Sequence, residues 1–101
     1  MVIIVENWAN VTGRIAGVGT SAEYQDFYAI ELDVEKVTDM NDYPNLLRIG
    51  PGSRLTVLIR QDVVRGLEME QGDRISVRTR KGGKDRFFAH PSAVAMLEKG
   101  K

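Results

Sequence analysis

An eight-residue alternation near the middle of the first half is the strongest constraint on how this chain can fold. Apolar residues at alternate positions are separated by small or acidic ones, in the order Tyr28, Ala29, Ile30, Glu31, Leu32, Asp33, Val34, Glu35. Successive side chains of a β-strand point to opposite faces, so this period of two is typical of a half-buried strand. We therefore predict a strand whose apolar side chains enter a core and whose acids lie on the outer face.

Shorter patterns of the same kind predict the strands on either side. Val11 to Ile15 alternates around Gly13, which indicates a strand with a bend, and the glycine-rich residues 16–26 are expected to form a loop. After a polar loop over 38–45, a third strand begins near Leu46, is interrupted at residues 50–52 and continues through 55–59. The pattern leaves open whether this is one kinked strand or two strands in a hairpin.

The last third of the chain predicts a helix, a hairpin and a closing turn. Residues 62–69 have the spacing of a short helix, and 71–73 form a turn before a fourth strand through Ile75 and Val77. A fifth strand over 86–89 should stop at Pro91, with Ser92 capping a last helical turn and residues 98–101 frayed.

Length and composition limit the class of protein. The chain has 101 residues, 43% of them hydrophobic, so we expect one domain over 1–101, with residues 1–8 as an N-terminal extension or strand. It has no cysteine, which excludes thiol chemistry and cysteine-ligated zinc and fits a cytoplasmic protein. The apolar run 1–5 is too short for a signal peptide or a membrane span, so no membrane partner is expected.

The charge of the chain is zero in total but is unevenly distributed. Residues 1–47 carry two bases and eight acids, a net charge of −6, and residues 48–101 carry twelve bases and six acids, a net charge of +6. Six of the bases lie within the thirteen positions of one hairpin that turns at Gly82-Gly83: Arg74, Arg78, Arg80, Lys81, Lys84 and Arg86. Such a cluster favours an anionic partner, or an acidic surface on the protein itself.

The order of these elements resembles the oligonucleotide/oligosaccharide-binding (OB) barrel. The resemblance covers residues 9–97 and rests on the glycine-bearing strand 11–15 and on Gly66-Leu67 leading to the strand 72–77. It implies an all-β fold, a five-stranded OB-type Greek-key barrel with a short helix between strands 3 and 4. An SH3-like or other small β-barrel would satisfy much of the same pattern.

The resemblance also implies a binding surface. OB barrels that bind nucleic acid use the outer faces of strands 2 and 3, between the loops that here correspond to 16–26 and 80–85. We therefore expect weak, non-enzymatic binding of single-stranded DNA or RNA, without a cofactor or metal. The residues expected to bind it are Arg78, Arg80, Lys81, Lys84, Arg86, Phe88, Tyr24 and Arg54.

The acidic face of the second strand opposes this expectation. Glu31, Asp33 and Glu35 would line the groove that a phosphate backbone should follow, and their charges would repel it. Pairing with Arg54 and Arg60 on the third strand would neutralise them, at a few tenths of a kcal/mol per pair. The groove would then carry mixed charge, which suits a weak or specific ligand.

Two alternatives remain at the level of sequence. Residues 54–77 are similar to molybdate-binding (Mop/TOBE-like) barrels, which implies a small oxyanion ligand, although Gln61-Asp62 stands where small hydroxyl donors would be wanted. The uneven charge also suits a protein-interaction module that forms homo-oligomers. Catalysis is not expected, because His90 is the only histidine and no serine has the context of a nucleophile.

Overall fold

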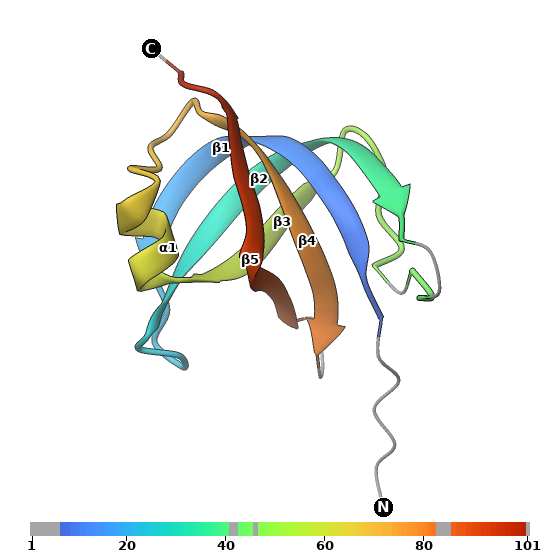
Figure 1. Ribbon diagram of the computed structural model, residues 1–101, viewed down its shortest axis with the longest axis horizontal. Coiled ribbons are helices and arrows are strands. Elements are labelled where there is room, and N and C mark those ends of the chain that lie inside the picture. Colours follow the sequence, from blue (N-terminus) through green and yellow to red (C-terminus); the bar gives the residue numbers. More distant parts are fainter. Residues whose placement is uncertain (1–6, 41–42, 46, 83–85, 101) are drawn as a thin grey trace, which may run out of the picture.

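Five strands and one short helix make up the described part of the chain, residues 7–40, 43–45, 47–82 and 86–100 of a computed structural model (Figure 1). In chain order they are β1 (Ala9–Thr20), β2 (Phe27–Asp39), β3 (Arg54–Arg60), α1 (Gln61–Gly66), β4 (Arg74–Gly82) and β5 (Arg86–Glu98). No helix among these residues is long and apolar enough to cross a membrane.

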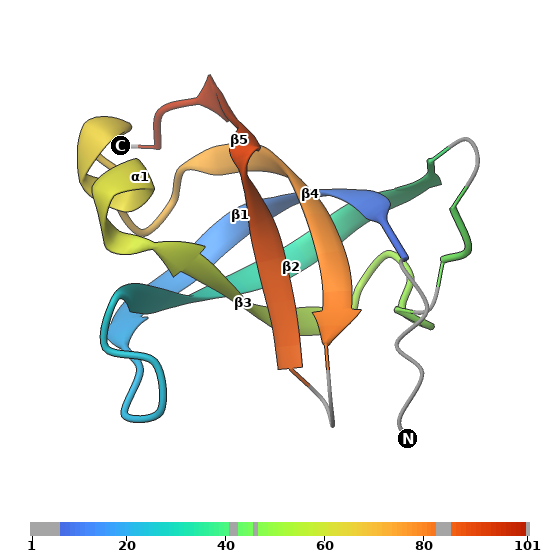
Figure 2. The ribbon, with the colours of Figure 1, turned by 60° about the horizontal axis from the view of Figure 1, so that its bottom comes forward.

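The strands close into a barrel in the order β1-β2-β3-β5-β4 (Figure 2). All neighbouring pairs are antiparallel except β3 and β5, which meet in parallel where Leu58 lies beside Phe88. The fold class expected from the sequence is confirmed: the protein is all-β, a closed five-stranded barrel with a short helix between β3 and β4.

Alternation places the core inside the barrel. On β2, Ile30, Leu32 and Val34 are buried, and the acids between them are exposed, so the strand predicted from residues 28–35 is confirmed. Strands β3 and β4 contribute alternate residues in the same way: Leu55, Val57, Ile59, Ile75, Val77 and Thr79. Each aliphatic side chain buried in this way contributes about 1.5–3 kcal/mol to folding.

The first strand belongs to two ladders at once. It pairs with β2 from Ala9 to Thr20 and with β4 from Ala9 to Arg14, and its register with β2 shifts between Thr12 and Gly13. A Cβ atom on Gly13 would lie 2.6 Å from the backbone oxygen of Asp33. Only glycine allows β2 to approach so closely at this bend.

Strand β1 is longer than the sequence predicts. The sequence predicts a loop from residue 16, but the strand continues through Gly17 and Gly19 to Thr20, and the loop to β2 occupies 21–26. The two glycines pair with Glu31 and Ala29 of β2. The ladder that β2 offers outweighs the low strand propensity of glycine.

Strand β5 also extends past its predicted end, and the helical turn predicted at 92–97 is wrong. Its second half pairs with β4, where Val77 lies opposite Val94, and Val94 and Met96 pack against the core. Pro91 falls in the register shift between Val77 and Thr79, where a missing N–H costs no ladder hydrogen bond.

The third strand is a single element, Arg54–Arg60, so neither the kinked strand nor the hairpin considered for 46–59 forms. Of the described residues before it, Leu47 is buried and Ile49 packs against the core without joining the sheet. Gly52 turns the chain with a φ of +89°, a conformation that favours glycine. The backbone of Val34 on β2 holds this turn through bonds with Gly52 and Ser53, both 2.8 Å long.

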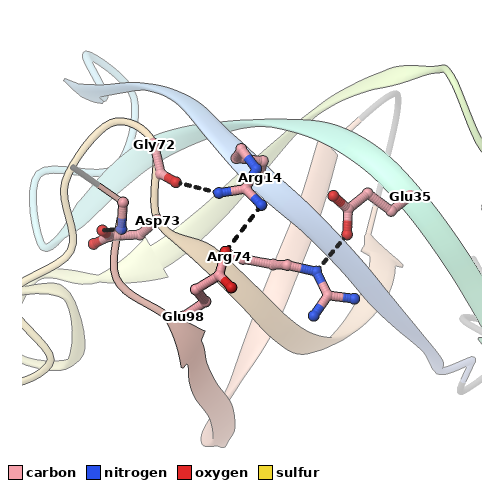
Figure 3. A network of polar contacts seen from close by, with 7 residues as sticks. Arg14, Glu35, Gly72, Asp73, Arg74 and Glu98 are labelled. Atoms are coloured by element: carbon pink, nitrogen blue, oxygen red, sulfur yellow. Dashed lines mark hydrogen bonds and ion pairs between the residues drawn. The ribbon is translucent and has the colours of Figure 1, made fainter.

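Three described residues close to the C-terminal end, Glu98, Lys99 and Gly100, make specific contacts, whereas the sequence predicts fraying over 98–101. Glu98 belongs to β5 and pairs with Arg14 at 3.2 Å (Figure 3). The buried carboxylate of Asp73 accepts hydrogen bonds from the Lys99 ammonium at 2.8 Å and from the Gly100 N–H at 2.7 Å. Residue 101 lies outside the described residues, as do residues 1–6 of the expected N-terminal extension.

Hydrogen bonds to the Asp73 carboxylate favour its charged form. Burial by itself would raise the pKa of this carboxyl, but the bonds from Lys99, Gly100 and the N–H of Glu70 outweigh burial and hold the pKa below its ordinary value. A carboxylate with a lowered pKa stabilises the fold above its unfolded-state pKa, and this contribution is lost as the pH falls through the folded-state pKa.

We predict that Gly13→Ala lowers the free energy of unfolding by about 1–3 kcal/mol, because the new methyl group overlaps the Asp33 backbone oxygen. The control is Gly19→Ala in the same strand, where the nearest atom lies 4.0 Å from the added Cβ and the change should stay within about 0.5 kcal/mol. Urea denaturation of both variants measures the difference. Equal losses would contradict the close approach at Gly13.

We predict that Asp73→Asn lowers the free energy of unfolding at pH 7 by about 1–3 kcal/mol, because the Lys99 ammonium and the Gly100 N–H lose a charged acceptor that is itself buried. Wild-type stability should fall as the pH drops from about 5 to below 3, and the variant should lose less over that window. Denaturation at stepped pH measures both curves, with the exposed Asp33→Asn as control. Parallel curves for wild type and Asp73→Asn would contradict this role.

Candidate nucleic-acid interface

The face expected to bind a ligand holds a groove of about 350 Å³. The groove lies over the outer faces of β2 and β3, between the β1–β2 loop and the start of β5. Its lining residues are Thr20, Ser21, Glu23, Ala29, Thr56, Leu58, Arg86 and Phe87. Both ends of the groove therefore come from segments that the sequence analysis assigned to binding.

Leu58 gives the groove an apolar wall. Leu55, Val57 and Ile59 point into the core, so Leu58 lies on the opposite face of β3, yet only 8% of it is exposed. It pairs with Ala29 of β2 and lies beside Phe88 of β5. Because so little of Leu58 is exposed, it offers a ligand only a small apolar surface.

Three aromatic rings attach the β1–β2 loop to β5. Tyr24 of the loop lies 5.3 Å from Phe88 and 6.2 Å from Phe27, and Phe27 lies 6.0 Å from Phe88, all edge to face. Two of the predicted site residues, Tyr24 and Phe88, are thus in direct contact. All three rings are half-buried and fix the loop against the barrel.

Cations line the outer face of β4. Ile75, Val77 and Thr79 are buried, so Arg78 and Arg80 lie on the outer side of the same strand. Arg80 pairs in register with Phe88, and its guanidinium lies 5.4 Å from the centre of that ring. This cation–π contact sets a positive charge beside an aromatic surface.

Trp8 and His90 extend this surface and were not identified from the sequence. Their rings lie 5.3 Å apart on the outer side of β4, which pairs with β1 on one edge and β5 on the other. Asn7 fixes the approach to β1 through its side-chain amide, which bonds the backbone N–H and oxygen of Lys81 at 2.8 and 3.0 Å. In the sequence, Trp8 falls within the expected N-terminal extension, and only the pairing of β4 reveals its neighbours.

Ion pairs neutralise much of the remaining charge around the groove. Arg54 lies 2.9 Å from Asp33 and 4.0 Å from Glu31, as expected from cross-strand pairing. Glu35, however, pairs with Arg74 of β4 at 2.6 Å (Figure 3), and Arg60 pairs with Asp62 at 3.3 Å instead of with an acid of β2. The expected role of Arg60 is therefore wrong.

Arg86 is held by the loop opposite it. Its guanidinium lies 2.5 Å from the Glu23 carboxylate, and this hydrogen bond and the charge of Glu23 hold the pKa of Arg86 above its ordinary value. The ion pair joins the two ends of the groove. The Glu23 carboxylate also offsets the positive charge of Arg86, so Arg86 attracts a phosphate less than its position in the sequence implies.

The cations available to an anion are therefore those of β4. Arg78, Arg80 and Lys81 form no ion pair with any residue that the structure describes. Lys84, the remaining predicted contact, lies outside the described residues. The structure thus brings together Arg78, Arg80, Phe88 and Tyr24 and separates Arg54, which lies on β3 beside the acids of β2.

Among residues 7–40, 43–45, 47–82 and 86–100, no group of three or more histidine, cysteine or acidic side chains is placed to hold a metal ion. Comparisons with protein-family models, with curated proteins and with solved structures found no match.

We predict that Phe88→Ala detaches the β1–β2 loop and lowers the free energy of unfolding by about 1–3 kcal/mol, less than for a fully buried phenylalanine. Amide hydrogen exchange of residues 22–27 should accelerate in this variant. The control is Leu97→Ala, which removes an apolar side chain that is 47% exposed. Unchanged exchange in the loop would contradict the anchoring role of Phe88.

Proposed function

We propose that this protein is an OB-type binding module that holds single-stranded DNA or RNA on the outer faces of β4 and β5 and catalyses no reaction. The observation that carries the proposal is the contact of Arg80 with Phe88, which places a cation against an aromatic ring on the outside of the barrel. Arg78 precedes it on the same face, and Trp8 and His90 flank that face.

Unpaired nucleotides match this combination of groups. Each base has a flat π-surface that stacks on an aromatic side chain, at about 1–3 kcal/mol per base, and each phosphate attracts a nearby arginine or lysine. A duplex hides the flat surfaces of its bases within the stack. The aromatic rings therefore favour single strands.

The charges favour a path over β4 instead of along β2 and β3. The outer face of β2 carries Glu31 and Asp33, which share one arginine, so that face keeps negative charge. Arg78 and Arg80 on the outer face of β4, and Lys81 near the end of the strand, form no ion pair with the described residues. A phosphate backbone therefore gains more electrostatic stabilisation over β4 than over β2.

The small number of cations on β4 without an ion pair predicts weak binding. Three unpaired cations correspond to a slope of about −2 in a plot of log affinity against log salt, since single strands give about −0.7 per phosphate contact. The chain as a whole has no net charge to attract a polyanion from a distance.

An oxyanion-binding role receives less support from the geometry. The pocket beside Gln61 and Asp62 contains Arg60 and Arg65, but Asp26 and Asp62 line it as well. Arg60 is already paired with Asp62. Carboxylates at this position repel molybdate or sulfate.

We predict that the triple variant Arg78→Ala/Arg80→Ala/Lys81→Ala weakens binding of a fluorescein-labelled oligothymidylate about tenfold or more and flattens its salt dependence. Fluorescence anisotropy at low and moderate salt, repeated with an oligouridylate, measures both effects and compares DNA with RNA. The matched control is Lys36→Ala/Arg48→Ala/Arg60→Ala, which removes the same charge from exposed positions off this face.

Two results would overturn the proposed function. The first is the absence of binding by the wild-type protein at tens of micromolar, and the second is an equal loss of affinity in both triple variants. A rise in thermal stability with molybdate and none with oligonucleotides would point to the oxyanion alternative. Concentration-dependent light scattering without either effect would point to self-association.

A further inference from the structure

Several stretches of strand edge in the barrel have no strand partner among the described residues, and the end of β1 is one of them. Strand β1 pairs with β2 as far as Thr20, but its pairing with β4 ends at Arg14. The next residue, Ile15, exchanges backbone hydrogen bonds of 2.7 and 2.8 Å with Asp73 and Gly72. Beyond it, no strand within the described residues pairs with the second edge of 16–20.

A groove of about 370 Å³ runs beside this open edge. It lies between the end of β1 and the segment formed by α1 and residues 67–70, which stand next to each other in Figures 1 and 2. Its apolar lining comes from Val18, Tyr28, Val64 and Met69. Val18 is 42% exposed, among the most exposed large apolar side chains that the structure describes.

An open edge beside an apolar groove is the arrangement that binds an extended peptide. The edge offers backbone N–H and C=O groups to a new strand, and the groove takes alternate side chains of that strand. Proteins usually protect such an edge with lysine, proline or a covering element. Here the edge residues of 16–20 are small or apolar and include no charge and no proline.

The rim of the groove selects the charge of the peptide. Glu68 and Glu70 are exposed and form no ion pair with described residues. The single arginine on the rim, Arg65, donates a hydrogen bond of 3.1 Å to the Tyr28 hydroxyl and lies 5.7 Å from that ring. The Lys99 ammonium pairs with Asp73, donates a hydrogen bond of 2.6 Å to the Glu68 backbone oxygen and also interacts electrostatically with Glu68 and Glu70. Three carboxylates against two engaged cations leave this rim with an excess of negative charge.

We propose that this site binds an extended segment of another protein, which adds as a strand to 16–20 of β1, places an aliphatic β-branched side chain in the groove and sets a flanking lysine or arginine against Glu68 and Glu70. The proposal is independent of nucleic-acid binding, because it uses none of the residues on the outer face of β4.

The test is an amide NMR titration of the full chain with the synthetic peptide acetyl-Lys-Thr-Val-Thr-Val-Thr-Lys-amide at millimolar concentration. Expected are shifts confined to residues 16–20 and 64–70, with slower hydrogen exchange of the amides in 16–20. The twin peptide with glutamate in place of both lysines should bind at least fivefold more weakly, since it meets like charge.

Two pairs of variants locate the site. Val18→Asp should abolish the shifts, whereas Leu97→Asp, at a second exposed apolar position, should preserve them. Glu68→Gln/Glu70→Gln should weaken binding about fivefold in low salt, and Asp33→Asn/Asp39→Asn, which removes the same charge elsewhere, should not.

The proposal fails if the peptide causes no shifts, if the shifts lie outside 16–20 and 64–70, or if both twin peptides bind equally. It also fails if these amides shift with protein concentration in the absence of peptide, because the edge would then pair with a second copy. The nucleic-acid variants on β4 should leave the titration unchanged, so failure of one proposal is distinguishable from failure of the other.

Discussion

The whole barrel depends on β1 serving as the partner of two strands. Closure requires its first half to pair with β2 on one edge and β4 on the other, and this brings the backbone of β2 against Gly13. A side chain at that position would push the two strands apart, and the ladder to β4 would lose its alignment. Once β1 holds both neighbours, the inward side chains of the remaining strands share one core, and all other positions are assigned to the outer surface.

That assignment creates the proposed nucleic-acid surface. Arg78, Arg80 and Phe88 are close together because β4 and β5 pair in register, and Trp8 reaches them because β1 pairs with the other edge of β4. The same closure pairs acids with bases from distant parts of the chain, such as Glu35 with Arg74 and Glu23 with Arg86. Ion pairs within the barrel therefore neutralise part of the uneven charge of the two halves. A small set of cations on β4 remains for the proposed ligand.

Closure also accounts for the second proposed site. The ladder between β1 and β4 ends at Arg14, and the turn held by Asp73 takes the place of β4 at Ile15. Asp73 in turn anchors Lys99 and Gly100, so this turn is fixed from both sides. Beyond it the edge of β1 has α1 and a groove beside it instead of a strand. The two proposed sites therefore differ in kind: the first uses side chains over β4, and the second uses the backbone and groove along 16–20.

The alternation within each strand could be predicted from the sequence, whereas the pairing between distant segments could not. The inward residues of β2, the helix after β3 and the outward positions of Arg78, Arg80 and Phe88 follow from patterns within a few residues, because burial acts on each strand with a period of two. The extension of β5 past Pro91, the anchoring of the chain end by Asp73 and the meeting of Trp8 with His90 each depend on a partner far away in sequence. The sequence by itself determined which faces are apolar and where the charges lie. Only the tertiary structure decided which charges neutralise one another and which strand edges stay unpaired, since both depend on the register between strands.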